Sequence, residues 1–362
     1  MDFMKTKSNF HYQTIYEDYK KAISSGEILG GDLLPGENSI ASAYSVDRST
    51  VRKALQMLVD EGLVEKKAGK GTIVKKETEK ESPSAISQKE TPNIGFFLPS
   101  GNAITQQFYS SLLNTCEKEL KRHGYTLIYS TFDEHDDVRE AVNKYKLAGI
   151  IFVSNISEKQ ITDALEDNIP CVLANSFDSR LPSILSDNEK GSYLAGKCLI
   201  ENGHRDVVLV SGTRSYVCSN ERAAGFMRAY REAGIEIPES SLLVCDSWEQ
   251  EAGTRVVKDY LDKCKKIPTA FFGFNDRIAF GIMSALRQCG LKVPEDVSVV
   301  GYDNLNAQLS VVPLTTIEAH VEYLAEATAE ALLWQLNGGN RNPYRISIPT
   351  ELIIGETVRK IK

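Results

Sequence analysis

From residue 93 onward, short apolar runs alternate with amphipathic patterns of helical spacing. Runs that are apolar almost throughout suit strands buried on both faces of a parallel sheet. Neighbouring parallel strands need long crossover connections, which are usually helices. The alternation therefore predicts an α/β structure with parallel sheets and helices on both faces.

The alternation runs through two successive sets. The first set predicts strands at 93–98, 127–130, 149–153 and 171–174, and helices at 108–123, 138–146 and 158–168. The second set begins after residue 202 and predicts strands at 207–211, 242–244, 270–273 and 297–301, and helices at 219–233, 250–263, 277–289 and 321–336. Two sets indicate two lobes, and a cleft between lobes is a natural site for a small molecule.

Residues 77–92 are charged, contain Ser and Pro, and have almost no apolar content, which is typical of a linker. We therefore expect three parts, namely 1–76, the linker 77–92, and 93–362. The first part is too short for a layered α/β structure. Its three helical patterns are followed by two short strands with a basic tip between them, which predicts an α+β winged helix-turn-helix.

The charge is distributed unevenly between these parts. The whole chain has a formal net charge of −7, whereas residues 1–76 hold twelve basic and ten acidic side chains and are net positive. An acidic body joined to a slightly basic module is consistent with one DNA-facing part. The excess is small, so the positions of the basic residues matter more than their number.

The third helical pattern carries the strongest indication of DNA binding. Asp47 occupies the N-cap position, and Arg48 and Arg52 are four residues apart on one helix face. In helix-turn-helix proteins this half of the helix enters the major groove, where arginine reads guanine. The hydroxyls of Ser49 and Thr50 suit phosphate oxygens. Isolated arginines usually only solvate a helix surface, but the surrounding pattern of helices, hairpin and linker favours DNA recognition.

Several segments of this part resemble the GntR-type winged helix over roughly residues 12–75. They are Leu34-Pro35-Gly36-Glu37, Val46 to Leu55, Glu61-Gly62-Leu63-Val64 and Gly69-Lys70-Gly71-Thr72. The resemblance implies DNA contacts by Glu37, Arg48, Arg52, Lys70 and Gly71. Asp47 departs from the Ser that is common in the family, and this acid is expected to serve as a helix cap.

In the second part, polar and aromatic residues lie where strands are expected to end, at the edge where open α/β sheets bind ligands. These residues are Phe108, Asn175, Arg222, Trp248, Asn275 and Asp303. Asp, Asn and Arg side chains can pair with sugar hydroxyls, and aromatic rings can stack on the sugar. Taken one at a time, the polar residues could be helix caps or ion pairs and the tryptophan could be core. Together they favour a ligand cleft.

The second part also resembles the LacI/GalR-type regulatory domain, which is periplasmic-binding-protein-like and two-lobed, over about residues 93–335. The matching segments are Asn93 to Pro99, Ser186 to Gly191, Asn202 to Arg205, Glu221 to Phe226, Asn275-Asp276, Val293 to Asn304 and Leu314 to Ile317. The resemblance implies that the six residues named above line an effector cleft. It also implies a homodimer that binds double-stranded operator DNA and is released by a small sugar.

The combination of a GntR-type reader with a LacI-type sensor resembles the arabinose repressors of Gram-positive bacteria. That resemblance implies a pentose, L-arabinose first, as the effector. Another monosaccharide or a purine remains an alternative, because Asn175 replaces a frequent Asp and Gln106-Gln107 replace a frequent Asn-Pro.

The sequence disfavours several other classes of protein. The seven cysteines are scattered and the five histidines isolated, so we expect buried cysteines, no metal site and no cofactor. No dinucleotide-binding, P-loop or nucleophile-elbow motif occurs, which argues against a Rossmann-like enzyme. The polar N-terminus and the absence of a long apolar run predict a cytoplasmic protein without a membrane segment, rather than a sugar-transport protein.

Overall fold

The computed structural model places most of the chain. It describes residues 8–24, 28–61, 63–67, 71–75, 91–100, 104–305, 307–309 and 311–361. The chain divides into two compact units, 1–88 and 89–362, called unit 1 and unit 2 below. Most of the predicted linker 77–92 lies outside the described residues, so its boundaries stay a prediction.

Unit 1 is a winged helix-turn-helix, as predicted. Its elements are α1 (Ser8–Ser24), α2 (Glu37–Ala43), α3 (Arg48–Asp60), β1 (Val64–Lys67) and β2 (Gly71–Val74). The two strands pair antiparallel to form the wing, and Leu33 forms a β-bridge to Ile73 beside them. The apolar faces of the helices close a small core around Ile15, Val51 and Leu55, which holds α3 against the rest of the unit.

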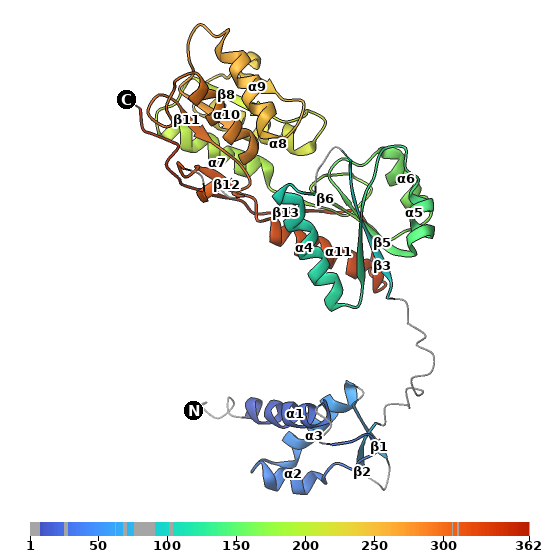
Figure 1. Ribbon diagram of the computed structural model, residues 1–362. Coiled ribbons are helices and arrows are strands. Elements are labelled where there is room, and N and C mark those ends of the chain that lie inside the picture. The colour runs from blue at the N-terminus through green and yellow to red at the C-terminus, as the bar shows by residue number, and fades with distance from the viewer. Residues whose placement is uncertain are drawn as a thin grey trace. The chain divides into compact units, whose positions relative to one another are not determined.

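The first lobe of unit 2 is built on a six-stranded parallel sheet with the order β13-β7-β6-β5-β3-β4. The strands are β3 (Asn93–Leu98), β4 (Thr126–Thr131), β5 (Leu147–Val153), β6 (Cys171–Ala174), β7 (Ser183–Ser186) and β13 (Arg345–Ile348). Its helices are α4 (Gln107–Arg122), α5 (Val138–Tyr145), α6 (Glu158–Glu166) and α11 (Val321–Leu336). Helices α4 and α11 lie side by side on one face and α5 and α6 cover the other (Figure 1).

The second lobe contains a four-stranded parallel sheet with the order β11-β10-β8-β9. Its strands are β8 (Val207–Ser211), β9 (Leu242–Val244), β10 (Ala270–Gly273) and β11 (Ser298–Val300), and an antiparallel pair, β12 (Thr316–Glu318) and β14 (Glu351–Ile353), lies beside them. The helices are α7 (Asn188–Glu201), α8 (Val217–Glu232), α9 (Gln250–Leu261) and α10 (Asp276–Gln288). Helices α7 and α8 pack on one face, and α9 and α10 on the other.

The chain passes between the two lobes of unit 2 three times. It leaves the first lobe after β7, returns to it through α11 and β13, and leaves it again for β14 (Figure 1). The first lobe therefore contains a helix and an edge strand that come from the far end of the sequence.

The predicted α/β architecture with parallel sheets is confirmed. Each strand and helix predicted for unit 2 is present within three residues of its predicted limits, whereas β7, α7, β12, β13 and β14 were not predicted. Five cysteines are buried as expected, but Cys289 is exposed and Cys264 partly so, which corrects the expectation for those two. Among the described residues, no helix combines the length and apolar content that crossing a membrane requires.

Candidate functional site

The first candidate site is the start of α3 in unit 1. The side chains of Arg48 and Arg52 are 57% and 59% exposed, so neither is buried in the fold. Both guanidinium groups contact one carboxylate oxygen of Glu37, which begins α2. Arg52 Nε lies 2.8 Å and Arg48 Nη2 3.4 Å from Glu37 Oε2. The hydrogen bond from Arg52 lowers the pKa of Glu37, so this carboxylate is charged and holds both arginines on one side of α3.

Asp47 caps α3, as the sequence predicts. Its carboxylate accepts a 3.0 Å hydrogen bond from the Thr50 amide, and the Ser49 hydroxyl also donates to it. The bond from Ser49 lowers the pKa of Asp47 to about 2. Thr50 is largely buried and its hydroxyl lies 3.2 Å from Asp47, so in this structure both predicted phosphate-binding hydroxyls serve the cap.

The wing contributes one described member of the predicted interface. Gly71 has a φ of +103°, a conformation that favours glycine, and an added Cβ would lie 3.1 Å from Leu33. Lys70 lies outside the described residues. Within the described part of unit 1, the candidate interface therefore consists of the exposed arginine face of α3 and the start of β2.

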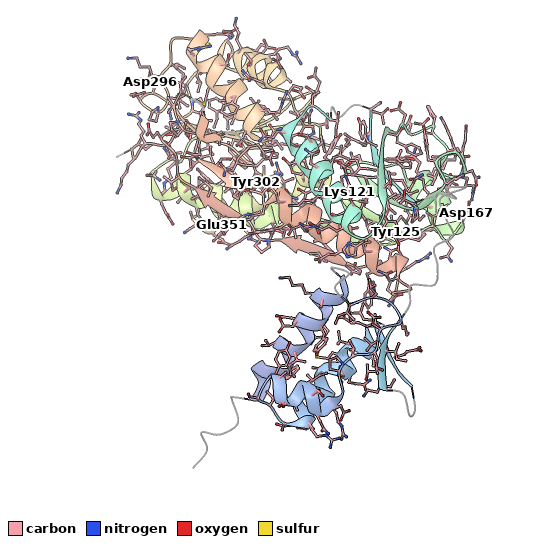
Figure 2. All side chains as sticks on the ribbon, turned by 60° about the horizontal axis from the view of Figure 1, so that its bottom comes forward. Lys121, Tyr125, Asp167, Asp296, Tyr302 and Glu351 are labelled. Carbon is pink, nitrogen blue, oxygen red and sulfur yellow. The ribbon has the colours of Figure 1, made fainter. Side chains whose placement is uncertain are left out.

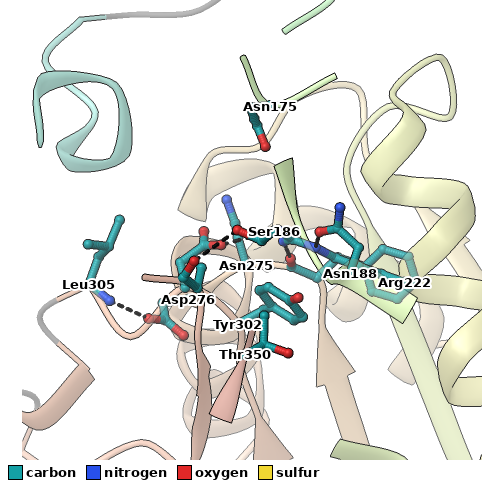
Figure 3. Close-up of polar contacts among 12 residues, drawn as sticks. Asn175, Ser186, Asn188, Arg222, Asn275, Asp276, Tyr302, Leu305 and Thr350 are labelled. Atoms are coloured by element: carbon teal, nitrogen blue, oxygen red, sulfur yellow. Dashed lines mark hydrogen bonds and ion pairs between the residues drawn. The ribbon is translucent and has the colours of Figure 1, made fainter. Parts of the chain in front are cut away.

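The second candidate site is a cavity in unit 2, where the two sheets present their carboxyl ends. All six predicted effector residues line it. The lining consists of Gln106, Phe108, Tyr109, Asn175, Tyr216, Cys218, Arg222, Trp248, Asn275 and Asp303. Phe108 and Asn175 come from the first lobe, and the side chain of Asn175 points toward the residues of the second lobe (Figure 3).

Arg222 is buried on one wall of the cavity and is held on several sides. Its Nε donates to Asn188 Oδ1 at 2.9 Å, its Nη1 to the main-chain oxygen of Phe274, and its Nη2 lies 3.3 Å from Asp303 Oδ1. The guanidinium group also stacks 3.6 Å from the ring centre of Tyr302, which lies inside unit 2 (Figure 2). These contacts fix the guanidinium group before any ligand binds.

Asp303 supplies the only acidic side chain among the described residues that line this cavity. Burial raises the pKa of Asp303 to about 6, and the charge of Arg222 acts in the opposite direction. The buried carboxyl of Asp276 accepts hydrogen bonds from Leu305 and Thr316, and Figure 3 shows the bond from Leu305. Arg222 and Asp303 balance each other, so the cavity suits a neutral ligand with hydroxyl or amide groups.

Two asparagines that line the cavity are held in place by hydrogen bonds to the protein, and one of them also caps a helix. Asn275 Oδ1 accepts from the Ile278 amide at 2.7 Å and so caps α10, while its Nδ2 donates to the main-chain oxygen of Trp248 at 3.1 Å. Asn175 Nδ2 lies 3.3 Å from Ser154 Oγ. Both amides are therefore positioned by the fold and still line the cavity.

The aromatic side chains form much of the remaining wall. Trp248 meets Tyr216 edge to face with ring centres 5.6 Å apart, and Phe108 meets Tyr109 in the same way at 5.4 Å. The buried Nε1 of Trp248 has no hydrogen-bond acceptor among the described residues. A ligand oxygen at this atom would satisfy the indole N–H.

Sequence reasoning did not assign four of the lining residues to the site, namely Gln106, Tyr109, Tyr216 and Cys218. Tyr216 and Cys218 follow β8, so the rule that ligands bind beyond strand ends could have found them. Among the described residues, no group of three or more His, Cys, Asp or Glu side chains is placed to hold a metal ion.

Each unit matches a known protein family. Residues 11–74 match the family of bacterial regulatory proteins of the gntR type, and residues 197–358 match the periplasmic binding protein-like domain. The chain is 33% identical over 294 residues to the HTH-type transcriptional repressor PurR of Vibrio parahaemolyticus, covering 77% of this chain and 86% of that protein. It is 31% identical over 333 residues to the arabinose metabolism transcriptional repressor of Halalkalibacterium halodurans, covering 87% and 85%.

A solved structure described as a LacI-type transcriptional regulator from Bacillus cereus has the same fold as unit 2. It superposes with a TM-score of 0.70 at 24% identity, covering 75% of this chain and all of that one. A winged helix joined to a two-lobed ligand-binding domain defines a DNA-binding transcriptional regulator. The chain belongs to the bacterial transcriptional repressors with a periplasmic binding protein-like domain, and it carries a gntR-type DNA-binding domain. These relatives are regulators and not enzymes, as the sequence predicts.

Proposed function

We propose that this repressor binds a palindromic operator as a cytoplasmic homodimer and is released when a neutral sugar, L-arabinose first, occupies the cavity of unit 2. A two-fold dimer presents two identical winged helices, and such dimers address two related half-sites. Arg48 and Arg52 read guanine edges, and Lys70 and the main chain at Gly71 contact the DNA backbone.

The observation that carries the proposal is the convergence of all six predicted effector residues on one cavity. A pentose offers several hydroxyl groups to the amides of Asn175 and Asn275 and to Asp303. Aromatic rings at Phe108 and Trp248 can stack on its C–H faces. The relative from Halalkalibacterium halodurans, an arabinose metabolism repressor, aligns with both units and supports the same choice.

A purine is the second candidate effector, because repressors named PurR are among the relatives. A planar base would stack between aromatic rings and pair its ring nitrogens with the two asparagines. The charge balance in the cavity fits either ligand, since both are neutral. A phosphorylated sugar fits less well, because Arg222 is the only basic residue in the described lining and is already paired.

The test is an operator gel-shift titration with L-arabinose, other pentoses and hexoses, and purine bases. Release of operator DNA by L-arabinose at lower concentration than by any other compound is the expected result. Release by hypoxanthine or guanine alone would replace the sugar with a purine. No effect of any of these compounds on operator binding would contradict the proposed effector site.

A further inference from the structure

Two contacts join the lobes of unit 2 near the cavity. At one of them, Gln106 precedes α4 in the first lobe, and its Nε2 donates to the carboxylate of Glu249 in the second lobe. Glu249 precedes α9 and also accepts from Arg277 in the first turn of α10. One carboxylate thereby joins α4 to two helices of the other lobe.

The other contact involves Asn155, which follows β5 in the first lobe. Its Nδ2 donates to the main-chain oxygen of Ser215 at 3.1 Å and lies 3.3 Å from the Ser215 hydroxyl oxygen. Ser215 lies between β8 and α8 in the second lobe. The amide of Asn155 therefore binds two oxygens of the opposite lobe at once.

Both contacts adjoin the effector cavity, and Gln106 lines it. Glu249, Asn155 and Ser215 are each one residue away in sequence from a lining residue or its hydrogen-bond partner. Glu249 follows Trp248 and Ser215 precedes Tyr216, and both of these aromatic residues line the cavity. Asn155 follows Ser154, whose hydroxyl oxygen lies 3.3 Å from the Asn175 amide. Glu249, Asn155 and Ser215 do not themselves belong to the lining, so their effect on a bound ligand must be indirect.

We propose that Gln106–Glu249–Arg277 and Asn155–Ser215 form a two-point clasp that sets the population of the closed lobes and hence the affinity for the effector. Each contact spans the two lobes and is lost when they separate. A ligand that requires the closed arrangement binds with an apparent affinity reduced by the fraction of molecules that are open. Glu249, Arg277, Asn155 and Ser215 are thus positioning residues for the effector site of the proposed function, whereas Gln106 also lines that site.

The closed population can be measured without any ligand. One spin label is attached to the exposed Cys289 in the second lobe and another to the first lobe after Lys159→Cys, with Cys264→Ser to remove the partly exposed thiol. The other five cysteines are buried. In full-length protein, Glu249→Ala combined with Asn155→Ala is expected to shift the inter-lobe distance distribution toward longer distances, with each single variant in between.

Glu251→Ala is the matched control, because Glu251 is an exposed acid on the first turn of α9. It should leave the distance distribution unchanged. A double variant with the wild-type distribution would overturn the clasp. Circular dichroism and thermal unfolding of each variant separate lobe opening from loss of the fold, since an opened protein keeps its helical signal.

The binding arm uses L-arabinose as the probe. In Glu249→Ala with Asn155→Ala, its Kd is expected to rise about tenfold, which corresponds to about 1.4 kcal/mol. Unchanged affinity in a protein whose lobes have opened would refute the control of affinity by the clasp. If wild-type protein does not bind L-arabinose, the proposed effector is wrong, while the ligand-free distances still decide whether the clasp exists.

Discussion

Single arginines in this protein serve opposite purposes, and their surroundings decide which. Arg48 and Arg52 keep more than half of their side-chain surface exposed and share one carboxylate behind them. Arg222 is 4% exposed and its nitrogens are bound to protein acceptors on three sides. Arg48 and Arg52 can still donate hydrogen bonds to DNA. Arg222 instead forms part of the cavity wall and balances the charge of Asp303.

Replacing Arg48 by Ala should sharply reduce operator specificity, because a bidentate arginine–guanine contact contributes about 1–3 kcal/mol of discrimination. Lys70→Ala should instead weaken binding to all sequences and lower the dependence on salt concentration by about one phosphate contact. Competition between operator and random DNA over a range of salt concentrations measures both effects. Unchanged operator affinity in Arg48→Ala would remove its base-reading role.

Glu37→Ala should reduce the ratio of operator affinity to random-DNA affinity about tenfold, within the range of a single base contact. Without this carboxylate the two guanidinium groups lose their common acceptor and must be ordered on binding. Glu17→Ala, an exposed acid on α1, is the control for the change of charge. If both variants change the ratio equally, the positioning of the arginines by Glu37 is not the cause.

The affinity for the effector should fall as the pH drops below about 6. Burial raises the pKa of Asp303 to about 6, so protonation over this range removes a carboxylate acceptor and the partner of Arg222. Isothermal titration from pH 5 to 7.5 measures the effect. Asp303→Asn should bind more weakly at neutral pH and show a flat profile; a variant that kept the wild-type pH dependence would assign it to another group.

At the scale of elements, the structure explains which segments could be predicted. The buried parallel strands can be predicted from their apolar content, and the amphipathic helices α9 and α10 from the spacing of their apolar residues. Helix α7 does not, because its buried face contains small residues in place of an apolar stripe. A Cβ on Gly191 would lie 2.5 Å from the Tyr302 hydroxyl oxygen, and one on Gly196 would lie 2.9 Å from Ala229.

Strand β13 was missed for a different reason. It is a short, largely exposed edge strand that pairs with β7. In the sequence, however, the segments of the second lobe lie between these two strands. Local pattern carries no information about such a partner. The site was predicted more completely. Asn175, Trp248, Asn275 and Asp303 lie within four residues after a strand end, and Phe108 and Arg222 lie in the first two turns of the helix that follows a strand. The additional lining residues Tyr216 and Cys218 flank the start of α8 and were not assigned to the site, although they follow β8 at the same edge of the sheet.

The cap of α3 is an element whose stability can be tested directly. Asp47→Ala should destabilise unit 1 by about 0.5–2 kcal/mol, because the Thr50 amide loses its acceptor. For a domain of this size each kcal/mol lowers the melting temperature by about 4–8 °C. Circular dichroism melts report the change. Asp47→Ser retains a capping oxygen and should be nearly neutral, so equal destabilisation by both substitutions would contradict the capping role.

At the scale of the whole molecule, units 1 and 2 have separate hydrophobic cores. We therefore expect two calorimetric unfolding transitions. L-arabinose at a hundred times its Kd should stabilise unit 2 by about 2.7 kcal/mol and leave the transition of unit 1 in place. A single transition that moves as one with ligand would show that the two units unfold cooperatively.

The late return of α11 and β13 to the first lobe has a consequence for protein synthesis. Domains fold as they leave the ribosome, beginning with the N-terminal one. The DNA reader is complete early, whereas the sheet of the first lobe lacks its edge strand, and the adjacent helix, until residues 321–348 have been made. A premature stop codon inside the second lobe would leave unit 1 intact, whereas the first lobe of unit 2 would lack α11 and β13. Such a truncated product would be expected to stay insensitive to inducer.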